Sequence, residues 1–526
     1  MHSTNDILHA VHREWAAFRR PGRLIAMAAA ALAVVVLGLL YAFGNHASCD
    51  GLCDAPPTGP DGALVHDQFS FLHRDLGENG GITVRLTSMR GTITYPPPHH
   101  DQIVPGLVPW AKAGIIVKGG VRPGSSYAAL MVTGSHGVRM QYDYRHDVAG
   151  SGGGVSARAP RWLRLTRSGD TVTGHESADG EHWTKVGTAR LPGLSGTAQV
   201  GLFATSPGDL TLRPVGIGGT TEQVRWTQAG GVFDHVGVEG ADPAARWRSD
   251  TVGEANRTDW EKYHTPAGAV VKNGTVTVTG SGDIGPAGGE DGARPAESTL
   301  GGLALALLVV LVVAVRLATS AYRREATGGA PVTRAELAAK AIVLAAVTFV
   351  TGLLALGVVM PVGRGVLKGN GIPVIEVSAL TGARVVAGTA AALALAAVLA
   401  LALGALLRRA RTAVPVAVLT TLLPYVATSF PLLPDGLSQW ILRVTPAAGF
   451  ATRQTLVAYP QVTAHYAPSA GYFPLPWWAG VAVLGAYAAL LLGLALRRRQ
   501  AGGTRRSAAW RAKARRVKTW RVKAWR

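Results

Sequence analysis

The residues best spaced for chemistry in this 526-residue chain are three carboxylates, Glu176, Asp179 and Glu181. Two carboxylates hydrolyse glycosidic bonds when they face each other across a cleft, roughly 5–9.5 Å apart. Instead, Glu176 and Glu181 flank the short sequence 177–180, Ser-Ala-Asp-Gly, which contains Asp179. In such a turn, aspartate bonds the turn backbone and glutamate faces water. The pattern predicts a hairpin turn, and we expect the chain not to be an enzyme.

Three tryptophans, Trp110, Trp162 and Trp183, belong to the same part of the chain. Indole rings stack on sugars, and they also fill the core of a β sandwich. Core packing is the interpretation that we favour, and sugar stacking stays open as the basis of an alternative function.

The chain has two cysteines, Cys49 and Cys53, in the sequence Cys-Asp-Gly-Leu-Cys. A structural zinc site needs four ligands, and no second Cys or His pair follows at finger spacing. The pair is either a small disulfide or two free thiols. We predict no metal and no cofactor.

A phosphate-binding loop of the form Gly-x-x-x-x-Gly-Lys-Ser/Thr does not occur anywhere in the sequence. If the chain moves a substrate against a gradient with ATP, we therefore expect a separate subunit to hydrolyse the ATP.

Charge is distributed unevenly along the chain. Residues 44–298 contain 22 Lys and Arg against 26 Asp and Glu, whereas the remainder contains 30 basic and 6 acidic residues. The net charge of +20 thus comes from segments that flank apolar runs, and from a tail with 13 basic and no acidic residues. Because the large polar region is slightly acidic, we expect no nucleic-acid binding. The tail, 497–526, is expected to lie on anionic lipid.

Six apolar runs are long enough to cross a hydrocarbon core as helices. The predicted spans are 24–43, 299–317, 337–361, 382–406, 412–433 and 476–496. An amphipathic interfacial helix, 1–23, precedes them, and a polar cytoplasmic segment, 318–336, joins the second and third spans. Lys and Arg gather on one side of this arrangement. We therefore predict a multi-pass protein of the cell membrane with both termini cytoplasmic and residues 44–298 outside.

The region between the first two spans has the pattern of an all-β domain. After a linker, 44–61, short alternating runs separated by Gly, Asn and Asp predict an antiparallel sandwich over 62–219. Residues 220–298 contain further strand-like pieces and a Gly/Pro-rich linker. Whether 220–279 extends the sandwich or forms a second module stays open.

Several segments of this region carry a resemblance. "PWAKAGIIVK" at 109–118, "GVRMQYDY" at 137–144, "PRWLRLTRSGDTVTGHESADGEHWTKVG" at 160–187 and "QVGLFATS" at 199–206 resemble a concanavalin A-like jelly-roll sandwich of the DUF1349 type. Some members of that superfamily bind carbohydrate, which is what the resemblance implies for the tryptophans.

The apolar part carries a second resemblance. "LHAVHREWAAFRRPGRL" at 8–24, "TSAYRREATGGAPVTRAELAAKAIVLAAVTFVTGL" at 319–353 and "ALGALLRRARTAVPVAVL" at 402–419 are similar to ABC-2-type transporter permeases of actinobacterial type. The resemblance implies six spans, a permease dimer, and a separate ATPase that docks on the cytoplasmic segment and on the interfacial helix. The residues in those positions are Tyr322, Arg323, Arg324, Glu325, Arg334, Glu14, Trp15 and Arg19. Common members of the family have only a short loop where this chain has its β domain.

These observations predict the permease subunit of an ATP-driven exporter, working by alternating access on a substrate that the sequence does not identify. The alternative is a membrane-anchored protein that binds or senses carbohydrate through its outer sandwich.

Overall fold

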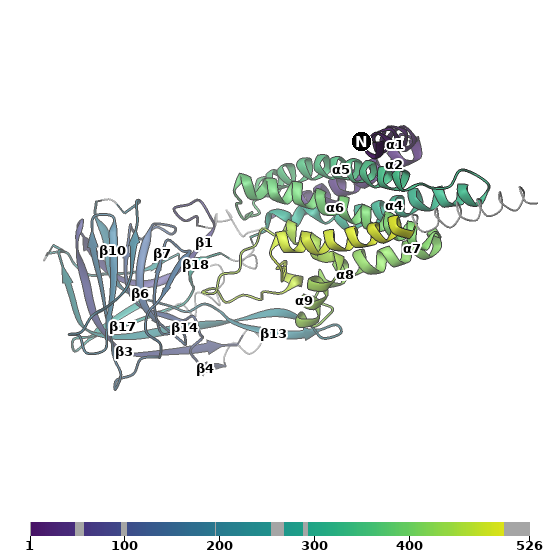
Figure 1. The fold of residues 1–526 in the computed structure, drawn as a ribbon. Coiled ribbons are helices and arrows are strands. Elements are labelled where there is room, and N and C mark those ends of the chain that lie inside the picture. Colours follow the sequence, from purple (N-terminus) through teal and green to yellow (C-terminus); the bar gives the residue numbers. More distant parts are fainter. Residues whose placement is uncertain are drawn as a thin grey trace, which may run out of the picture.

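Helices and strands occupy opposite ends of the molecule (Figure 1). The computed structural model describes residues 2–47, 57–95, 102–194, 196–242, 244–253, 268–287 and 293–498, with side chains from Leu8 onward. The cysteine pair Cys49 and Cys53, predicted as either a disulfide or two free thiols, lies outside the described residues, as does the basic tail beyond Arg498.

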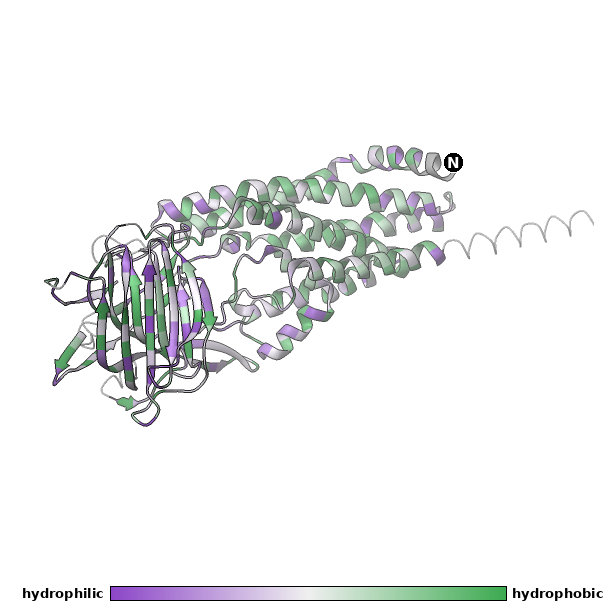
Figure 2. Ribbon diagram, turned by 60° about the vertical axis from the view of Figure 1, so that its left-hand side comes forward, coloured by the Kyte–Doolittle hydropathy of each residue, from purple (hydrophilic) through white to green (hydrophobic). Residues whose placement is uncertain are grey.

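Within these described ranges, six helices are long and apolar enough to cross a membrane, which is the number that the sequence predicts. They are α2 (Pro21–Gly44), α4 (Leu303–Ala326), α5 (Arg334–Gly369), α6 (Ala379–Leu407), the run Ala410–Thr428 and the C-terminal helix Trp477–Arg498. Shorter elements of the block are α1 (His2–Phe18), η1 (Ala296–Leu300), α9 (Asp435–Val444), η3 (Pro446–Arg453) and η4 (Pro468–Ala470). Coloured by hydropathy, the long helices carry extended hydrophobic stretches (Figure 2).

The connection between α4 and α5 is shorter than the predicted segment 318–336. Helix α4 continues to Ala326 with Arg323 and Arg324 in its last turn, where positive charge is favourable beside the helix C-terminus. Helix α5 begins directly after Thr333, whose side chain accepts a hydrogen bond from the backbone N–H of Glu336. Only residues 327–333 remain as a loop.

The predicted fifth span, 412–433, is broken and ends earlier. It consists of α7 (Ala410–Ala417), a π-helical turn η2 (Val418–Leu422) and α8 (Leu423–Thr428). Pro424 explains the break, because it cannot donate the hydrogen bond to the carbonyl four residues back.

The segment 434–474, between the last two predicted spans, contains structure that the sequence analysis does not predict. Residues 446–452 of η3 are fully buried in the helical block. Close contact with the C-terminal helix requires glycines: a Cβ at Gly480 would lie 2.1 Å from the backbone oxygen of Ala448.

The described strands form two antiparallel sheets and a short ribbon. The seven-stranded sheet has the order β15-β2-β12-β5-β6-β7-β8, and the nine-stranded sheet has the order β11-β10-β9-β3-β14-β17-β16 with β13 and β4 at its side. Their bounds are β2 Phe69–Leu76, β3 Asn79–Thr94, β4 Ile103–Pro105, β5 Lys112–Lys118, β6 Tyr127–Thr133, β7 Val138–Tyr142, β8 His146–Ala149, β9 Arg161–Ser168, β10 Thr171–Ser177, β11 Thr184–Arg190, β12 Ala198–Thr205, β13 Asp209–Val215, β14 Gly219–Glu239, β15 Arg248–Val252, β16 Gly268–Lys272 and β17 Thr275–Gly280.

The two sheets pack face to face around one core of buried Leu, Ile, Val and Ala side chains. Strand β14 pairs with β3 in the middle of the nine-stranded sheet, and β17 and β16 follow it, so the region after 219 extends the same sandwich. Among the strand-like pieces of this region, β16 and β17 pair with each other as a hairpin. Its turn is Asn273-Gly274, both with positive φ, as a two-residue hairpin turn requires.

A ribbon of two short strands carries the chain into and out of the β domain. Strand β1 (Val65–Asp67) pairs with β18 (Ile284–Pro286), and the ribbon covers the outer face of the seven-stranded sheet. Two lysines of β5 hold it there. Lys118 Nζ lies 2.7 Å from Asp67 Oδ2, and Lys112 Nζ lies 2.5 Å from Asp283 Oδ1, with both lysines fully buried.

The hairpin of β13 and β14 reaches from the sandwich to the helical block (Figure 1). Its tip packs its backbone on residues 431–434, just before α9, and the Ile217 N–H donates to the oxygen of Leu432 over 3.1 Å. At the base of the tip, His465 Nε2 lies 2.7 Å from Asp435 Oδ2. The same nitrogen lies 3.2 Å from the Thr220 hydroxyl, within hydrogen-bond distance. The β domain is therefore joined to the helices by more than its two covalent connections.

Replacing Gly219 by valine should detach this tip, because a Cβ there would lie 1.9 Å from the backbone oxygen of Pro431. Overpacking of this kind costs about 1–3 kcal/mol. Thermal unfolding of the full chain in detergent should show a lower midpoint for Gly219→Val. Gly154→Val is the matched control, because its Cβ would meet no atom within 4 Å. Equal midpoints in the two variants would contradict the docking.

Candidate functional site

Helix α1 is fastened to the start of α5 at the end of the helical block that lies away from the β domain (Figures 1 and 2). Ala10 and Phe18 face inward and are buried, and Phe18 joins the main core of the block. Leu8 and Trp15 are exposed on the other side, and the Arg19 guanidinium lies 4.9 Å from the Trp15 ring. The helix thus presents one face to the protein and one apolar and basic face outward.

A buried lysine makes the central contact between α1 and α5. Lys340 is only 2% exposed, and its Nζ lies 2.5 Å from Glu14 of α1 and 2.7 Å from Glu336 one turn earlier on α5. Glu336 also pairs with Arg324 at the end of α4, over 3.5 Å. The cluster therefore ties α1, α4 and α5 together, and the paired carboxylates allow the ammonium to be buried.

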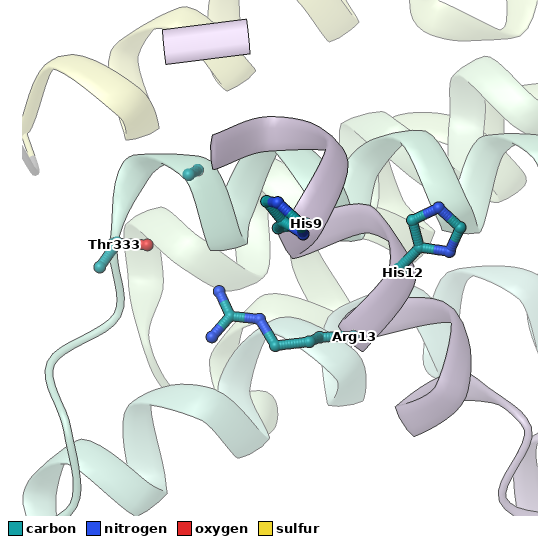
Figure 3. Close-up of a pocket in the computed structure, with 5 residues that line it drawn as sticks. His9, His12, Arg13 and Thr333 are labelled. Carbon is teal, nitrogen blue, oxygen red and sulfur yellow. The ribbon is translucent and has the colours of Figure 1, made fainter. Parts of the chain in front are cut away.

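An open pocket of about 650 Å³ adjoins this cluster. His9, His12 and Arg13 of α1 line it together with Thr333 and Ala335 at the start of α5 (Figure 3). Imidazole and guanidinium groups are donors that suit carboxylate or phosphate groups. The pocket is suited to an acidic group of a partner.

The predicted docking residues divide into exposed and buried side chains. Arg323, Arg324 and Arg334 are exposed, and Glu14 is committed to Lys340. Glu325 is half-buried next to them. The arginines share this end of the block with Arg409, Arg411, Arg497 and Arg498, which are also exposed.

Tyr322, which the resemblance places among the docking residues, has a buried side chain. Its side chain is 7% exposed within the main helical core, and the Arg408 guanidinium lies 5.6 Å from its ring. Helix α4 continues through this residue, and the ring lies in the helical core beside Arg408, the residue after α6. Tyr322→Ala would remove core packing and destabilise the helical block. A loss of ATPase binding in that variant would therefore not distinguish a docking role from a structural role.

Sequence reasoning missed the part played by Lys340, Glu336 and Arg408. The first two carry a recognisable signal, since Glu and Lys four residues apart pair on one helix face and a lysine inside an apolar run needs a partner. Arg408 follows the C-terminus of α6 with a φ of 59°, and no local pattern places it over Tyr322.

The three tryptophans considered for sugar stacking are each in contact with a cationic or imidazole side chain. Trp110 is 6% exposed and stacks on His136, with ring centroids 3.9 Å apart. The Arg164 guanidinium lies 3.8 Å from the centre of the Trp183 ring, and that of Arg85 lies 5.7 Å from Trp162. Trp110 is thus core packing, while Trp162 and Trp183 are partly buried.

Two of the three carboxylates of the hairpin, Asp179 and Glu176, have structural partners, and the Glu181 side chain is exposed. Asp179 accepts hydrogen bonds from the backbone N–H groups of Glu181 and His182 and contacts the His182 ring, which holds its pKa well below the usual range. Glu176 is buried and accepts from Ser151. The predicted role of Asp179 in the turn backbone is confirmed. Within the described ranges, no three His, Cys, Asp or Glu side chains are grouped so that they could hold a metal ion.

Glu297, in η1 just before α4, is a buried carboxyl at the other end of the block. It accepts hydrogen bonds from the backbone N–H and the hydroxyl of Thr455, and burial raises its pKa. A folded-state pKa above the unfolded value means that the folded state binds the proton more tightly. Stability from this group is present at low pH and is lost as pH rises from about 4.5 through the raised pKa.

Glu297→Gln should therefore remove a pH-dependent part of the stability, because the amide stays neutral and can still bond Thr455. Thermal unfolding in detergent should show the variant gaining on the wild type between pH 4.5 and 8. A difference between the two proteins that is constant over this range would contradict the assignment.

No protein family and no curated protein sequence matches the chain. Solved structures give only partial similarity. A functionally unknown protein from Saccharomyces cerevisiae is 18% identical, with 36% of this chain and 83% of that one covered and a TM-score of 0.22. Scytalido-glutamic peptidase is 9% identical, with 41% and 98% covered and a TM-score of 0.24. The GH43 protein BlXynB from Bacillus licheniformis is 13% identical, with 31% and 28% covered and a TM-score of 0.19. At these TM-scores, the similarities assign neither fold nor function.

Proposed function

We propose that this chain is the permease subunit of an ATP-driven exporter of the ABC-2 type, with both termini cytoplasmic and the β domain outside the cell. Six apolar helices support the membrane assignment. The basic residues gathered at the end of the block away from the β domain support the orientation, since Lys and Arg favour the cytoplasmic side.

The observation that carries the proposal is the clamp of α1 on α5 through Glu14, Lys340 and Glu336. It makes α1 and the 327–333 loop parts of one rigid face, which also bears Arg323 and Arg334. A separate ATPase with acidic groups would bind this face. Movement of the ATPase would then pass to α4 and α5, two of the spanning helices, and open the pathway outward.

A permease dimer belongs to the proposal, and the transported substrate is not assigned. The alternative is that the outer domain binds carbohydrate, and the contacts of its tryptophans do not favour it. Arg164 occupies one face of the Trp183 ring, and Trp110 is buried, so neither of these faces is open to a sugar.

Affinity purification of the tagged full chain in mild detergent tests the proposal, with ATP hydrolysis by the purified complex as the readout. Arg323→Glu should reduce the co-purified ATPase activity about tenfold, because it replaces attraction by repulsion at an exposed docking site. Arg158→Glu makes the same change at an exposed position in the β domain and should have no effect. Absence of ATPase activity from the wild-type preparation, or equal activity in the two variants, would reject the docking face.

A further inference from the structure

An exposed apolar surface lies where the β13–β14 hairpin meets the helical block. Ile217, at the hairpin tip, is 81% exposed although its backbone is bonded to Leu432. The surface, which we call the hairpin–α9 surface, consists of Ile217, Phe430, Leu432, Leu437, Trp440 and Val444, each at least 44% exposed. Large apolar side chains gathered in this way mark a binding surface.

The α9 part of this surface is one face of an amphipathic helix. Leu437, Trp440 and Val444 recur at helical spacing and point outward, while Ser438 and Leu442 are buried against the block. Arg443, also exposed, supplies a positive charge beside them. This is the composition of a helix that lies in the plane of a membrane surface.

The tip of the hairpin is held at the level of α9 by backbone packing. A Cβ at Gly218 would lie 3.1 Å from the Pro434 ring, and the Gly219 backbone lies against Pro431. Ile217 is the side chain at this tip, between those contacts, and it is not used to hold the hairpin in place. Its exposed side chain is therefore free to contact something outside the described chain.

We propose that the hairpin–α9 surface binds the outer leaflet of the membrane, so that the β domain rests on the lipid through Ile217 while α9 lies in the interface. The proposal rests on the membrane crossing in the proposed function. Lipid is the expected binding partner because the surface is continuous with a candidate membrane span. It follows directly on the run Ala410–Thr428, whose Leu419 and Leu423 are exposed. Trp477 and Trp478 begin the C-terminal helix and are exposed as well, as interfacial tryptophans are.

Spin labels in the full chain, reconstituted in nanodiscs of zwitterionic and anionic phospholipid, test the proposal. Single cysteines would be introduced as Ile217→Cys and Trp440→Cys in a Cys49→Ser/Cys53→Ser background. Collision rates with oxygen, which concentrates in lipid, and with a water-soluble nickel chelate report the surroundings of each label. Val270→Cys on the edge strand β16, 56% exposed, is the water-facing control, and Leu354→Cys in α5, 65% exposed, is the lipid-facing control.

The labels at Ile217 and Trp440 should collide severalfold more often with oxygen than with nickel, relative to the label at Val270. A nickel-dominated Ile217 label would place the tip in water and overturn the proposal. Low collision rates with both reagents would mean that protein, such as a second copy, covers the surface, and would overturn it too. If the Leu354 label is itself in water, the membrane crossing fails, which separates that failure from this one.

Discussion

Replacing Lys340 by methionine should release α1 from the helical block. It should also disrupt the face of α1 and the 327–333 loop that we propose binds the ATPase. Lys340 is 2% exposed between Glu14 and Glu336, so its removal takes the cation away from Glu14 and leaves Glu336 with only its 3.5 Å pair to Arg324. Breaking a buried ion pair by removing one partner costs about 3–5 kcal/mol. We expect a lower unfolding midpoint in detergent, faster proteolysis within residues 8–18, and loss of ATPase association.

The carboxylates provide the control for this experiment. Glu14→Gln alone should have a smaller effect, because Glu336 still pairs with Lys340. The double variant Lys340→Met/Glu14→Gln should recover part of the stability, since the only carboxylate that then remains in the cluster is Glu336, which keeps its pair with Arg324. If Lys340→Met leaves α1 as resistant to proteolysis as in the wild type, the clamp does not hold the helix.

The second large effect is expected in the β domain, at Asp67 and Lys118. Both side chains are completely buried, 2.7 Å apart, and Tyr144 donates a further hydrogen bond to Asp67. Lys118→Met would leave a buried aspartate without its cation, at a cost of about 3–5 kcal/mol. Because Asp67 belongs to the ribbon that leads from α2, we expect the ribbon to leave the sheet and the β domain to unfold at a lower temperature.

A surface ion pair of the same domain makes a matched comparison. Arg145 and Asp61 lie 3.0 Å apart but are 45% and 46% exposed, so Arg145→Met should cost no more than about 1 kcal/mol. Near-equal unfolding midpoints for Lys118→Met and Arg145→Met would contradict the prediction. They would show that losing the buried Lys118–Asp67 pair costs no more stability than losing the exposed pair.

The sequence predicts those features that one stretch of chain determines by itself. Apolar runs of sufficient length become helices, and short runs between turn residues, such as those of β5, β6 and β12, become strands in the sandwich. The turn between β10 and β11 follows from Asp179 and Gly180 for the same reason, because a local backbone need selects the residue type.

The features that were missed depend on contacts between distant segments. Tyr322 is polar enough for a surface, and only Arg408 and the neighbouring helices make its position a core. η3 is too short for a span and is buried only because Gly449 and Gly480 allow close approach to the C-terminal helix. Likewise, Lys340 in the sequence indicates only which side of the membrane the start of α5 lies on. Its structural role comes from the ion pair with Glu14 on another helix.

Sidedness labelling tests the central claim, that the two ends of the helical block lie on opposite sides of a membrane. Gly154→Cys in the β domain and Ala330→Cys in the α4–α5 loop are exposed positions, each to be made in the Cys49→Ser/Cys53→Ser background. With a membrane-impermeant maleimide on intact cells, we predict labelling of Gly154→Cys at once and of Ala330→Cys only after permeabilisation. Labelling of both positions in intact cells, or of Ala330→Cys alone, would contradict the account.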